Sequence, residues 1–364
     1  MLTLHASWSP GELRVVAWDG RLIDYAISRD SGPDDVGALH RGRIIARVPA
    51  MAGSFVALAN AEGFLPDSEG GGAGDGTLIG IRITRTAQAG KGPRLSARLS
   101  ESDQALIGQG PPAKLRQGPD ALDRLIALHS QAMVLMDDVE AARGRATRIT
   151  PRAFTGEIEA EIASLAEPVA GLPNGGSMSV YPTPALVAID IDLGSATAER
   201  SSKSIAQSRA NHTMLPELCR QIRLRNLSGA ILVDLGGMAL RKRASLAPAF
   251  TQALASDPLA PRFLGFSALG LAEILRPRIH PPLHELLAGP HAAALTALRA
   301  VLRERSTNPA ANPTLHATPT IAAALHADAT ALAALAQRTG RDLIITEDRS
   351  LPAPGWRLQE LARG

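Results

Sequence analysis

The segment PALVAIDID at residues 184–192, with its echo AILVD at residues 230–234, decides how the middle of this chain folds. Both runs are apolar and rich in β-branched residues, which predicts strands buried within a sheet. Both end on carboxylates, Asp190 and Asp192 in the first run and Asp234 in the second. A charge in such a run is costly unless a partner, a hydrogen-bond network or a metal ion compensates for it. Because one long helical pattern separates the runs, we expect adjacent strands that bring Asp190 and Asp234 together.

These carboxylates suggest a metal site. Asp190 and Asp192 lie two residues apart on the predicted strand, so their side chains point to the same face of the sheet. The alternative is that strand-end carboxylates accept hydrogen bonds from backbone amides. Asp234 on a second strand favours the metal, because carboxylate oxygens are ligands that Mg²⁺ prefers and sites in α/β sheets lie at the carboxyl ends of strands. The expected cofactor is Mg²⁺, held by Asp190 and Asp234.

Composition limits the class of protein. A chain of 364 residues with 45% hydrophobic residues can build two or three domains with real cores. Its one cysteine, Cys219, excludes intrachain disulfides and paired-cysteine metal sites, and its place in a helical pattern predicts simple packing. The first residues lack the pattern of a signal peptide, and no run of eighteen apolar residues occurs. We therefore expect a cytoplasmic protein that does not bind membranes.

Residues 40–99 predict a small barrel that binds nucleic acid. Short strand patterns at residues 42–48, 54–58 and 78–84 are typical of such a barrel. Eight basic residues and four acidic ones fall between positions 40 and 98, which favours an anionic partner. Phe55 and Phe64 could be core residues, but bases of a single strand stack on aromatic rings while cations meet its backbone, as in OB folds. Lys91 lies at the tip of the loop Gly-Lys-Gly.

The remaining patterns place elements around these two regions. Residues 1–28 predict strands with turns at residues 10–11 and 19–20, and residues 101–117 predict a polar connector. We expect further strands at 133–136, 263–266 and 342–346, and helices at 120–132, 157–165, 203–225, 246–255, 271–276 and from 291 onward.

Arginines flank the two Asp-bearing strands, at residues 220–225, 241–243 and 276–278. Such clusters are by default solvated faces, although arginine also binds phosphate oxygens in a bidentate manner. The pair His280 and His284 imitates a metal-binding spacing, but the two intervening prolines prevent the histidines from sharing a helical face.

Taken in order, these segments resemble the ribonuclease E/G family. The specific part of the resemblance runs from LPNGGS at residues 172–177 through AIDID at 188–192 and RQIRLRNLSG at 220–229 to Asp234. The segment LGLAEILRPR at residues 269–278 is also similar. Looser similarity covers RGR at residues 41–43, the segments FV at 55–56 and GFLP at 63–66, and KGPRLS at 91–96.

The resemblance implies an α/β (α+β multi-domain) architecture. Residues 1–37 plus 112–153 would form an RNase H-like domain and residues 38–100 an inserted OB-fold domain. Residues 154–285 would form a DNase I-like catalytic domain and residues 290–364 a small C-terminal α/β domain. It further implies residue roles: Asp190 and Asp234 hold the catalytic Mg²⁺, with Asp192 beside them, and Arg276 lies near the scissile phosphate. The residues expected to bind RNA are Phe55, Phe64, Lys91, Arg43 and Arg94.

Three departures from the family's pattern matter. Asp192 stands where the family usually has Asn, which adds a negative charge beside the metal. The family's long segment that senses a 5′ monophosphate is replaced by the short connector at residues 101–117. The paired cysteines of its zinc link are missing, so no zinc-link dimer is expected and the sequence leaves the oligomeric state open.

The sequence thus predicts a metal-dependent endoribonuclease, a hydrolase that cleaves single-stranded RNA in RNA processing or decay, independently of the RNA's 5′ end. One alternative is a non-catalytic or weakly active RNA-binding paralogue of the same family, which Asp192 motivates. Another is a metal-dependent phosphoesterase for small substrates, for which no salt-sensitive affinity for RNA is expected.

Overall fold

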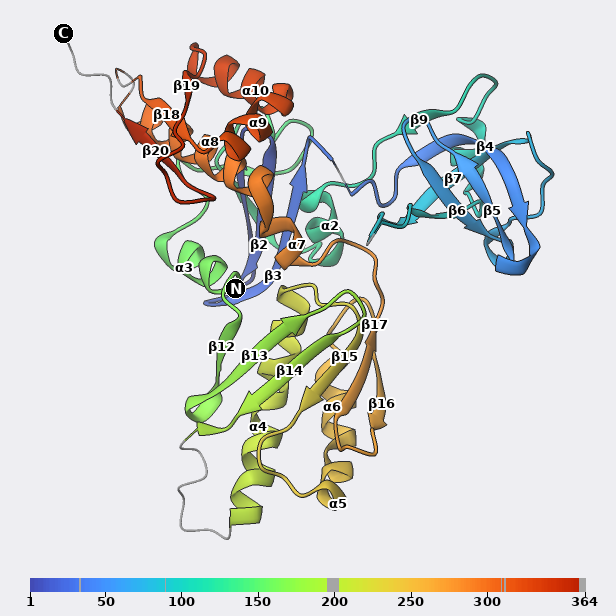
Figure 1. The fold of residues 1–364 in the computed structure, drawn as a ribbon, viewed down its shortest axis with the longest axis vertical. Coiled ribbons are helices and arrows are strands. Elements are labelled where there is room, and N and C mark those ends of the chain that lie inside the picture. The colour runs from blue at the N-terminus through green and yellow to red at the C-terminus, as the bar shows by residue number, and fades with distance from the viewer. Residues whose placement is uncertain (33, 89, 195–202, 309, 311, 360–364) are drawn as a thin grey trace. The chain divides into compact units, whose positions relative to one another are not determined.

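The chain has a mixed α/β fold that forms two compact units. The computed structural model describes residues 1–32, 34–88, 90–194, 203–308, 310 and 312–359. Unit 1 comprises Met1–Pro33, Asp120–Ala166 and Leu283–Gly364, and unit 2 comprises Asp34–Pro119 and Glu167–Pro282. Each unit is therefore assembled from segments far apart in the sequence, as the colours of Figure 1 make visible.

Unit 1 begins with a five-stranded sheet of order β11-β10-β1-β2-β3. Its strands are β1 (Thr3–Ser9), β2 (Glu12–Trp18), β3 (Leu22–Arg29), β10 (Met133–Met136) and β11 (Arg148–Ile149). The predicted turns are confirmed, because β1, β2 and β3 pair antiparallel through two hairpins. The core combines apolar residues of β1, β2 and β10 with helix α2 (Ala121–Leu128). The predicted helix at 120–132 ends four residues early.

The barrel of unit 2 is inserted where unit 1 runs from β3 to α2. Within unit 1 the two ends of this break touch, since Ser28 Oγ accepts a hydrogen bond of 2.6 Å from the Ala121 amide. Within unit 2 the entering and leaving chains also touch. A Cβ on Gly118 would lie 2.3 Å from the Val36 carbonyl oxygen, so only glycine allows this approach.

The second part of unit 1 is alanine-rich and helical, as predicted. It contains α7 (Leu283–Leu287), α8 (Gly289–Thr307), α9 (Pro319–Ala327) and α10 (Ala329–Thr339). A small sheet of order β19-β18-β20 accompanies them, with β18 (Thr314–Ala317), β19 (Ile345–Glu347) and β20 (Trp356–Gln359). The expected strand at 342–346 therefore starts later. Among the described residues no single helix has the length and hydropathy of a membrane span; the pair α9 and α10, bent by 80°, meets those criteria only jointly.

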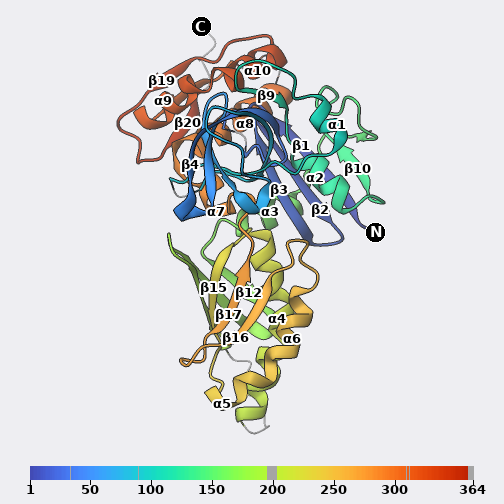
Figure 2. The same cartoon turned by 90° about the vertical axis from the view of Figure 1, so that its right-hand side faces the viewer.

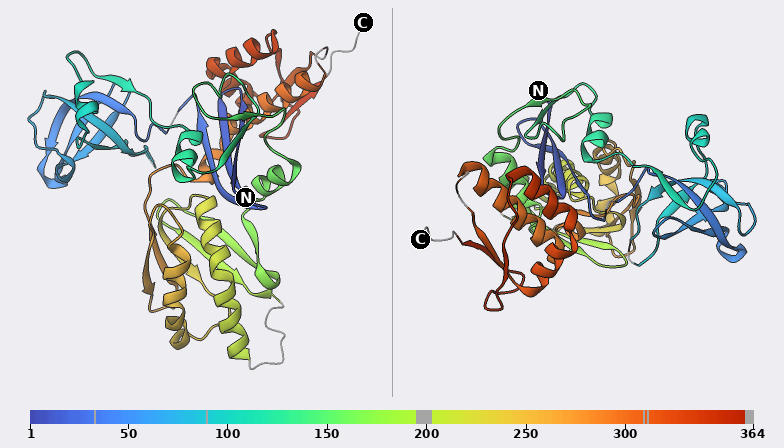
Figure 3. Two further views of the ribbon diagram at one scale, coloured as in Figure 1. Left: turned by 180° about the vertical axis from the view of Figure 1, so that it is seen from behind. Right: turned by 90° about the horizontal axis from the view of Figure 1, so that it is seen from above.

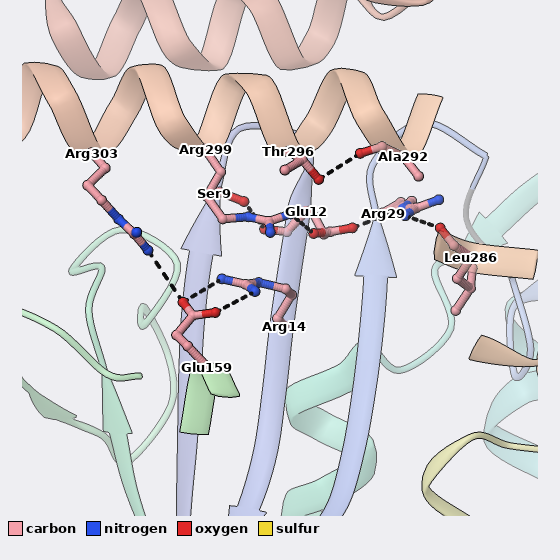
Figure 4. Close-up of polar contacts among 10 residues, drawn as sticks. All are labelled: Ser9, Glu12, Arg14, Arg29, Glu159, Leu286, Ala292, Thr296, Arg299 and Arg303. Atoms are coloured by element: carbon pink, nitrogen blue, oxygen red, sulfur yellow. Dashed lines mark hydrogen bonds and ion pairs between the residues drawn. The ribbon is translucent and has the colours of Figure 1, made fainter. Parts of the chain in front are cut away.

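Ion pairs join α8 to the first sheet and to α3 (Gly156–Ser164) within unit 1 (Figure 4), and those of Glu12 are buried. Glu12 on β2 is 3% exposed and accepts from Arg29 at 3.1 Å and from Arg299 of α8 at 2.7 Å. One turn into α3, Glu159 accepts from Arg14 at 3.4 Å and from Arg303 at 3.5 Å. Every charge in this network thus has an opposite charge beside it, which burial requires.

Unit 2 contains a closed five-stranded barrel, which fits the predicted OB fold (Figures 1 and 2). Its strands are β4 (Leu39–Val48), β5 (Gly53–Ala57), β6 (Glu62–Pro66), β7 (Leu78–Arg85) and β8 (Arg94–Ser96). Numbered one to five, they pair in the order 1-2-3-5-4, and β7 closes the ring by pairing with β4. The interior is apolar, with Ile44, Val56, Leu65, Ile81, Ile83 and Leu95 in its core.

The segment after the barrel corrects the expectation of a plain connector. It forms α1 (Glu101–Ala105) and β9 (Ala113–Arg116), and β9 pairs antiparallel with β4. Ser100 caps α1 by accepting from the Asp103 amide, and buried Asp103 forms ion pairs with Arg82 and Arg116. The polar composition of this segment hid the elements, because their stability comes from these ion pairs and from β4 rather than from apolar periodicity.

The second part of unit 2 is a six-stranded sheet of order β12-β13-β14-β15-β17-β16. The strands are β12 (Val169–Leu172), β13 (Gly176–Pro182), β14 (Val187–Asp192), β15 (Gly229–Asp234), β16 (Arg262–Phe266) and β17 (Ala272–Arg276). Helices α4 (Lys203–Leu224) and α6 (Ala247–Leu254) lie against one face, and α5 (Leu240–Arg243) precedes α6 (Figures 1 and 3). The opposite face of the sheet carries no helix of this unit in these views.

The predicted helix at residues 271–276 is wrong, because these residues form strand β17. Ala272, Ile274 and Arg276 are buried, whereas Glu273 and Leu275 are more exposed, which is the two-residue alternation of a strand. A six-residue apolar run cannot be assigned to helix or strand by periodicity alone. The antiparallel pairing of β17 with both β15 and β16 decides it.

Candidate active site and nucleic-acid interface

Asp190 and Asp234 lie side by side on adjacent strands, as the two apolar runs predicted. Strands β14 and β15 pair in parallel with Asp190 opposite Asp234, and paired residues of neighbouring strands are about 5 Å apart. Ile189 and Val233, one residue earlier, point into the core, so both carboxylates point to the open face and are exposed. The strand alternation alone therefore brings two negative charges together on one surface.

Asp192 points to the same face two residues further along β14. Its Oδ1 accepts a hydrogen bond of 2.8 Å from the Gly194 amide, so the alternative of a carboxylate bonded to a nearby backbone amide applies to this residue. Asp192 pairs with Ser177 and Asp190 with Ser179 on β13. Residues 195–202, which follow this turn, lie outside the described part of the chain.

Asp234 is oriented by an arginine that the sequence did not single out. Arg243 donates to Asp234 Oδ1 at 3.0 Å and to the carbonyls of Met238, Leu235 and Gly270. Its side chain is 10% exposed, whereas that of Asp234 is 55% exposed. Arg243 belongs to the cluster at residues 241–243, and three backbone carbonyls and one carboxylate satisfy its buried guanidinium. No local sequence signal distinguishes it from Arg241 and Lys242.

The carboxylate pair fits a hard cation. Two exposed carboxylates on neighbouring strands repel each other, and a divalent ion between them relieves that repulsion while leaving positions for water and a phosphate oxygen. In the described ranges, no group of three or more His, Cys, Asp or Glu side chains is arranged to hold a metal ion. The pair would therefore supply two ligands, with the others coming from solvent and substrate.

The structure does not bring Arg276 to this site. Arg276 pairs with Gly229 at the start of β15, whereas Asp234 ends that strand five residues later, roughly 17 Å away. The side chain is 3% exposed and forms an ion pair of 2.7 Å with Asp257. It also donates to Asn226 Oδ1 at 2.7 Å and to the Leu227 carbonyl at 3.1 Å. In this position Arg276 anchors the turn that leads into β15.

On the barrel, the two predicted aromatic residues form a pair on the outer surface. Phe55 and Phe64 are opposite each other on β5 and β6, with ring centroids 5.6 Å apart in an edge-to-face arrangement. Both are partly exposed, whereas the alternating neighbours Val56 and Leu65 are buried. A Cβ at Gly53 would lie 2.5 Å from the Phe64 ring, so glycine is needed beneath that ring. These rings are not members of the buried barrel core.

The predicted basic residues surround this aromatic pair. Arg94 on β8 pairs with Phe64 in the neighbouring strand and is exposed. Lys91 is exposed on the loop before β8, where its amide donates to the Gln88 carbonyl at 3.0 Å. Arg43 lies on β4 opposite Ala57, two residues from Phe55, and donates to the Gly76 carbonyl at 3.0 Å. Strand pairing thus relates Phe55, Phe64, Arg94 and Arg43 on one barrel surface, and Lys91 lies on the loop that leads into β8.

Residues 121–279 match the model of the Ribonuclease E/G family. Ribonuclease E of Synechocystis sp. is 33% identical over 134 residues, which cover 36% of this chain and 20% of that protein. Ribonuclease E of Escherichia coli (strain K12) is 33% identical over 130 residues, covering 35% and 12%. Ribonuclease G of Escherichia coli (strain K12) is 32% identical over 133 residues, covering 36% and 27%. Residues 121–279 are thus similar to the ribonuclease E/G family.

The matched part of the chain spans about a fifth of the length of the Synechocystis ribonuclease E. The ribonuclease E/G match includes β14 and β15 and hence both carboxylates of the pair. It excludes the barrel, which ends before residue 121. The Asp190/Asp234 pair therefore lies inside the matched residues, whereas the barrel lies outside them.

Proposed function

We propose that this protein is a Mg²⁺-dependent endoribonuclease that hydrolyses phosphodiester bonds in single-stranded RNA. The observation that carries this proposal is the Asp190/Asp234 pair, exposed on adjacent strands within the ribonuclease E/G match. We assign residues 1–37 plus 112–153 to an RNase H-like domain, 38–100 to an OB fold, 154–285 to a DNase I-like catalytic domain and 290–364 to a small C-terminal domain.

Each residue of the proposed site has a distinct task. Asp190 and Asp234 hold the ion, and Arg243 fixes the orientation of Asp234 by bonding one of its oxygens. Bound Mg²⁺ supplies a Lewis acid for the phosphodiester and lowers the pKa of a bound water. The open face of the sheet leaves room for an extended strand, and the products carry 5′-phosphate and 3′-hydroxyl ends. On the barrel, Phe55 and Phe64 stack bases while Arg43, Lys91 and Arg94 contact phosphates.

The test is cleavage of labelled single-stranded RNA with Mg²⁺. Asp190→Asn and Asp234→Asn should each reduce the rate at least 100-fold, because each removes one of two charged ligands. Asp190 is exposed, so Asp190→Asn should unfold at the wild-type temperature. Asp234→Asn also removes the negative charge beside the buried Arg243 guanidinium, so this variant should unfold at a lower temperature. Asp342→Asn, an exposed acid in unit 1, is the matched control and should cleave normally. Cleavage that survives both site substitutions would refute the proposed site.

Asp192→Asn examines the departure from the family's usual residue. Asparagine retains an oxygen that can accept from the Gly194 amide, so the turn is preserved. Removing the third negative charge reduces repulsion of the phosphodiester, and we expect a lower KM for RNA. An unchanged KM in this variant would show that the charge at position 192 does not reach the substrate.

We also propose indifference to the RNA's 5′ end. Only α1 and β9 lie between the barrel and residue 120, in place of a long sensing segment. Substrates with a 5′ triphosphate, a 5′ monophosphate or a circular backbone should be cleaved at equal rates. A strong preference for the monophosphate would contradict this expectation.

The second candidate is an RNA-binding paralogue without catalysis. It is motivated by Asp192 and by the missing family segments, the 5′-sensing segment and the paired cysteines. RNA binding by the full chain, with no Mg²⁺-dependent cleavage across several substrates, would favour this candidate over the nuclease.

A further inference from the structure

A row of side chains crosses four neighbouring strands on the outer surface of the barrel. Phe55 on β5 is opposite Phe64 on β6, and Phe64 is opposite Arg94 on β8. Arg94 in turn is opposite Arg85, the last residue of β7. Paired residues of neighbouring strands are about 5 Å apart, so Phe55, Phe64 and Arg94 follow one another in line. The register of β7 shifts between Ile83 and Arg85, and Arg85 lies partly buried beside Arg94 at this irregularity. An aromatic surface therefore continues directly into a cationic one.

A third arginine, Arg278, lies where this row ends. The residue after Arg85, Thr86, donates its amide to the carbonyl of Ile279 at 3.0 Å. Gln88 Nε2 donates to the His280 carbonyl at 3.2 Å, so the chain after β7 runs beside the chain after β17 within unit 2. These backbone contacts hold Arg85 and Arg278 near each other.

The guanidinium of Arg278 is seated on backbone rather than on a carboxylate. A Cβ at Gly229 would lie 2.3 Å from Nε of Arg278, so the side chain lies directly against this glycine. Its Nη2 contacts the Ala185 carbonyl at 3.4 Å. Any larger residue at position 229 would displace the arginine, and the positive φ of 84° at Gly229 also favours glycine.

Arg85, Arg94 and Arg278 carry no acidic partner among the residues that the structure describes. Within the part of the chain that the structure describes, no ion pair joins Arg85, Arg94 or Arg278 to a carboxylate. Burial, then the like charges of Arg94 and Arg278, lower the pKa of Arg85. Nε of Arg85 is buried and makes no hydrogen bond in the described structure. Three cations that repel one another are stable together when an anion lies between them.

We propose that Arg85, Arg94 and Arg278 form a binding site for the phosphodiester backbone of the single strand whose bases stack on Phe55 and Phe64. Bidentate guanidinium groups suit phosphate oxygens, and alternating stacking and phosphate contacts are how barrels of this kind hold a strand. Of the three, only Arg94 was expected from the sequence to bind RNA. The identity of the ligand, single-stranded RNA, rests on the proposed function. The arginine site does not require that the protein hydrolyses this RNA.

The experiment measures the affinity of the full chain for single-stranded RNA against salt concentration, in EDTA so that Mg²⁺-dependent cleavage cannot occur. Each phosphate contact contributes roughly 0.7 to the slope of log K against log salt for a single strand. Arg85→Gln and Arg278→Gln should each reduce the slope by about that amount and weaken binding several-fold. Arg94→Gln, at an exposed position where a folding defect is not expected, should do the same. Arg21→Gln, an exposed arginine of unit 1, is the charge-matched control and should leave the slope unchanged.

A second arm replaces single phosphodiester linkages of the RNA with uncharged ones. At one or two positions the neutral linkage should weaken binding by the wild type. At the same positions it should leave binding by Arg85→Gln or Arg278→Gln unchanged, since these variants have already lost the contact between arginine and phosphate. A merely structural role for these arginines would give no such coupling.

A third arm titrates inorganic phosphate. The proposal would be overturned if inorganic phosphate bound with micromolar affinity that depends on the three arginines, while the salt slope of RNA binding was the same in the variants as in the wild type. The site would then be assigned to a free anion.

The outcomes separate this inference from the nuclease. Wild-type RNA binding whose slope is the same in all three variants refutes the arginine site and leaves the nuclease intact. Reduced slopes in a protein that never cleaves RNA support the arginine site and refute the nuclease. A wild-type chain that does not bind RNA refutes both.

Discussion

Two groups of arginines, one in each unit, differ in whether a carboxylate lies beside them. In unit 1, Arg14, Arg29, Arg299 and Arg303 each contact Glu12 or Glu159 (Figure 4). In unit 2, Arg85 and Arg94 of the barrel and Arg278 after β17 have no such partner among the described residues. An arginine whose charge is neutralised by a carboxylate therefore stabilises the fold. An arginine without such a partner can instead bind a polyanion. Arg276, buried against Asp257, behaves like the arginines of unit 1.

The largest expected effect tests the paired side of this contrast. Glu12→Gln removes the acid that serves both Arg29 and Arg299, leaving two arginines without it in a buried setting. We expect the free energy of unfolding to fall by about 3–5 kcal/mol, because breaking a buried pair leaves an uncompensated charge. Urea unfolding measures the loss. The salt dependence of RNA binding should stay at the wild-type value, and a reduced slope would mean that unit 1 also contacts RNA.

Arg276→Gln asks whether a buried arginine in unit 2 is structural or catalytic. The variant leaves Asp257 buried without its ion pair, and we expect a loss of about 3 kcal/mol in unfolding free energy. Cleavage per folded molecule should remain. A variant of wild-type stability that no longer cleaves RNA would instead support the role near the scissile phosphate that the family resemblance implies.

Phe64→Ala tests the stacking part of the exposed row. Stacking of a base on an aromatic residue contributes about 1–3 kcal/mol, so RNA affinity should fall by roughly 5-fold to 150-fold. The salt slope should be unchanged, because no phosphate contact is removed. Phe250→Leu in the core of the six-stranded sheet is the contrasting control, which should lower stability and leave RNA affinity of the folded protein intact. Unchanged affinity in Phe64→Ala would exclude this ring from the RNA site.

The smallest effect extends the contrast from arginine to histidine. His40 on β4 is buried and neither ring nitrogen has a partner in the described structure, so burial lowers its pKa. The unfolded chain then binds the proton more readily than the native barrel. Stability should be constant above the unfolded value of about 6.5 and fall as pH decreases below it, by less than about 1.4 kcal/mol per pH unit. Urea midpoints at pH 7.5 and 5.5 measure this loss, which His40→Gln should reduce.

Much of the site could be predicted from sequence because strand alternation is local. The runs before Asp190 and Asp234 are apolar and β-branched, and their adjacency follows from one intervening helix, predicted at 203–225 and found at Lys203–Leu224. The barrel surface was predictable for the same reason, since Phe55 and Phe64 alternate with buried neighbours.

The parts that sequence reasoning missed depend on contacts across long separations. Arg243 satisfies its charge with carbonyls and a carboxylate that no periodicity connects to it. Strand β17 was predicted as a helix because its short apolar run fits both the helical and the strand periodicity. Only its pairing with β15 shows that it is a strand. Arg85 and Arg278 are 193 positions apart, and nothing in either segment indicates that Thr86 bonds to Ile279.

The way the barrel is spliced into the chain bears on how such a protein can be rearranged. Ser28 and Ala121 already touch in unit 1, and the Val36 and Gly118 backbones already touch at the base of the barrel. A short peptide joining the first pair would bridge β3 and α2 without stretching either, because insertions with adjacent ends impose little strain on their host. The barrel can thus be gained, lost or exchanged as one piece. The proposed binding of a nucleic-acid strand would change with it, whereas the Asp190/Asp234 pair proposed for cleavage would remain.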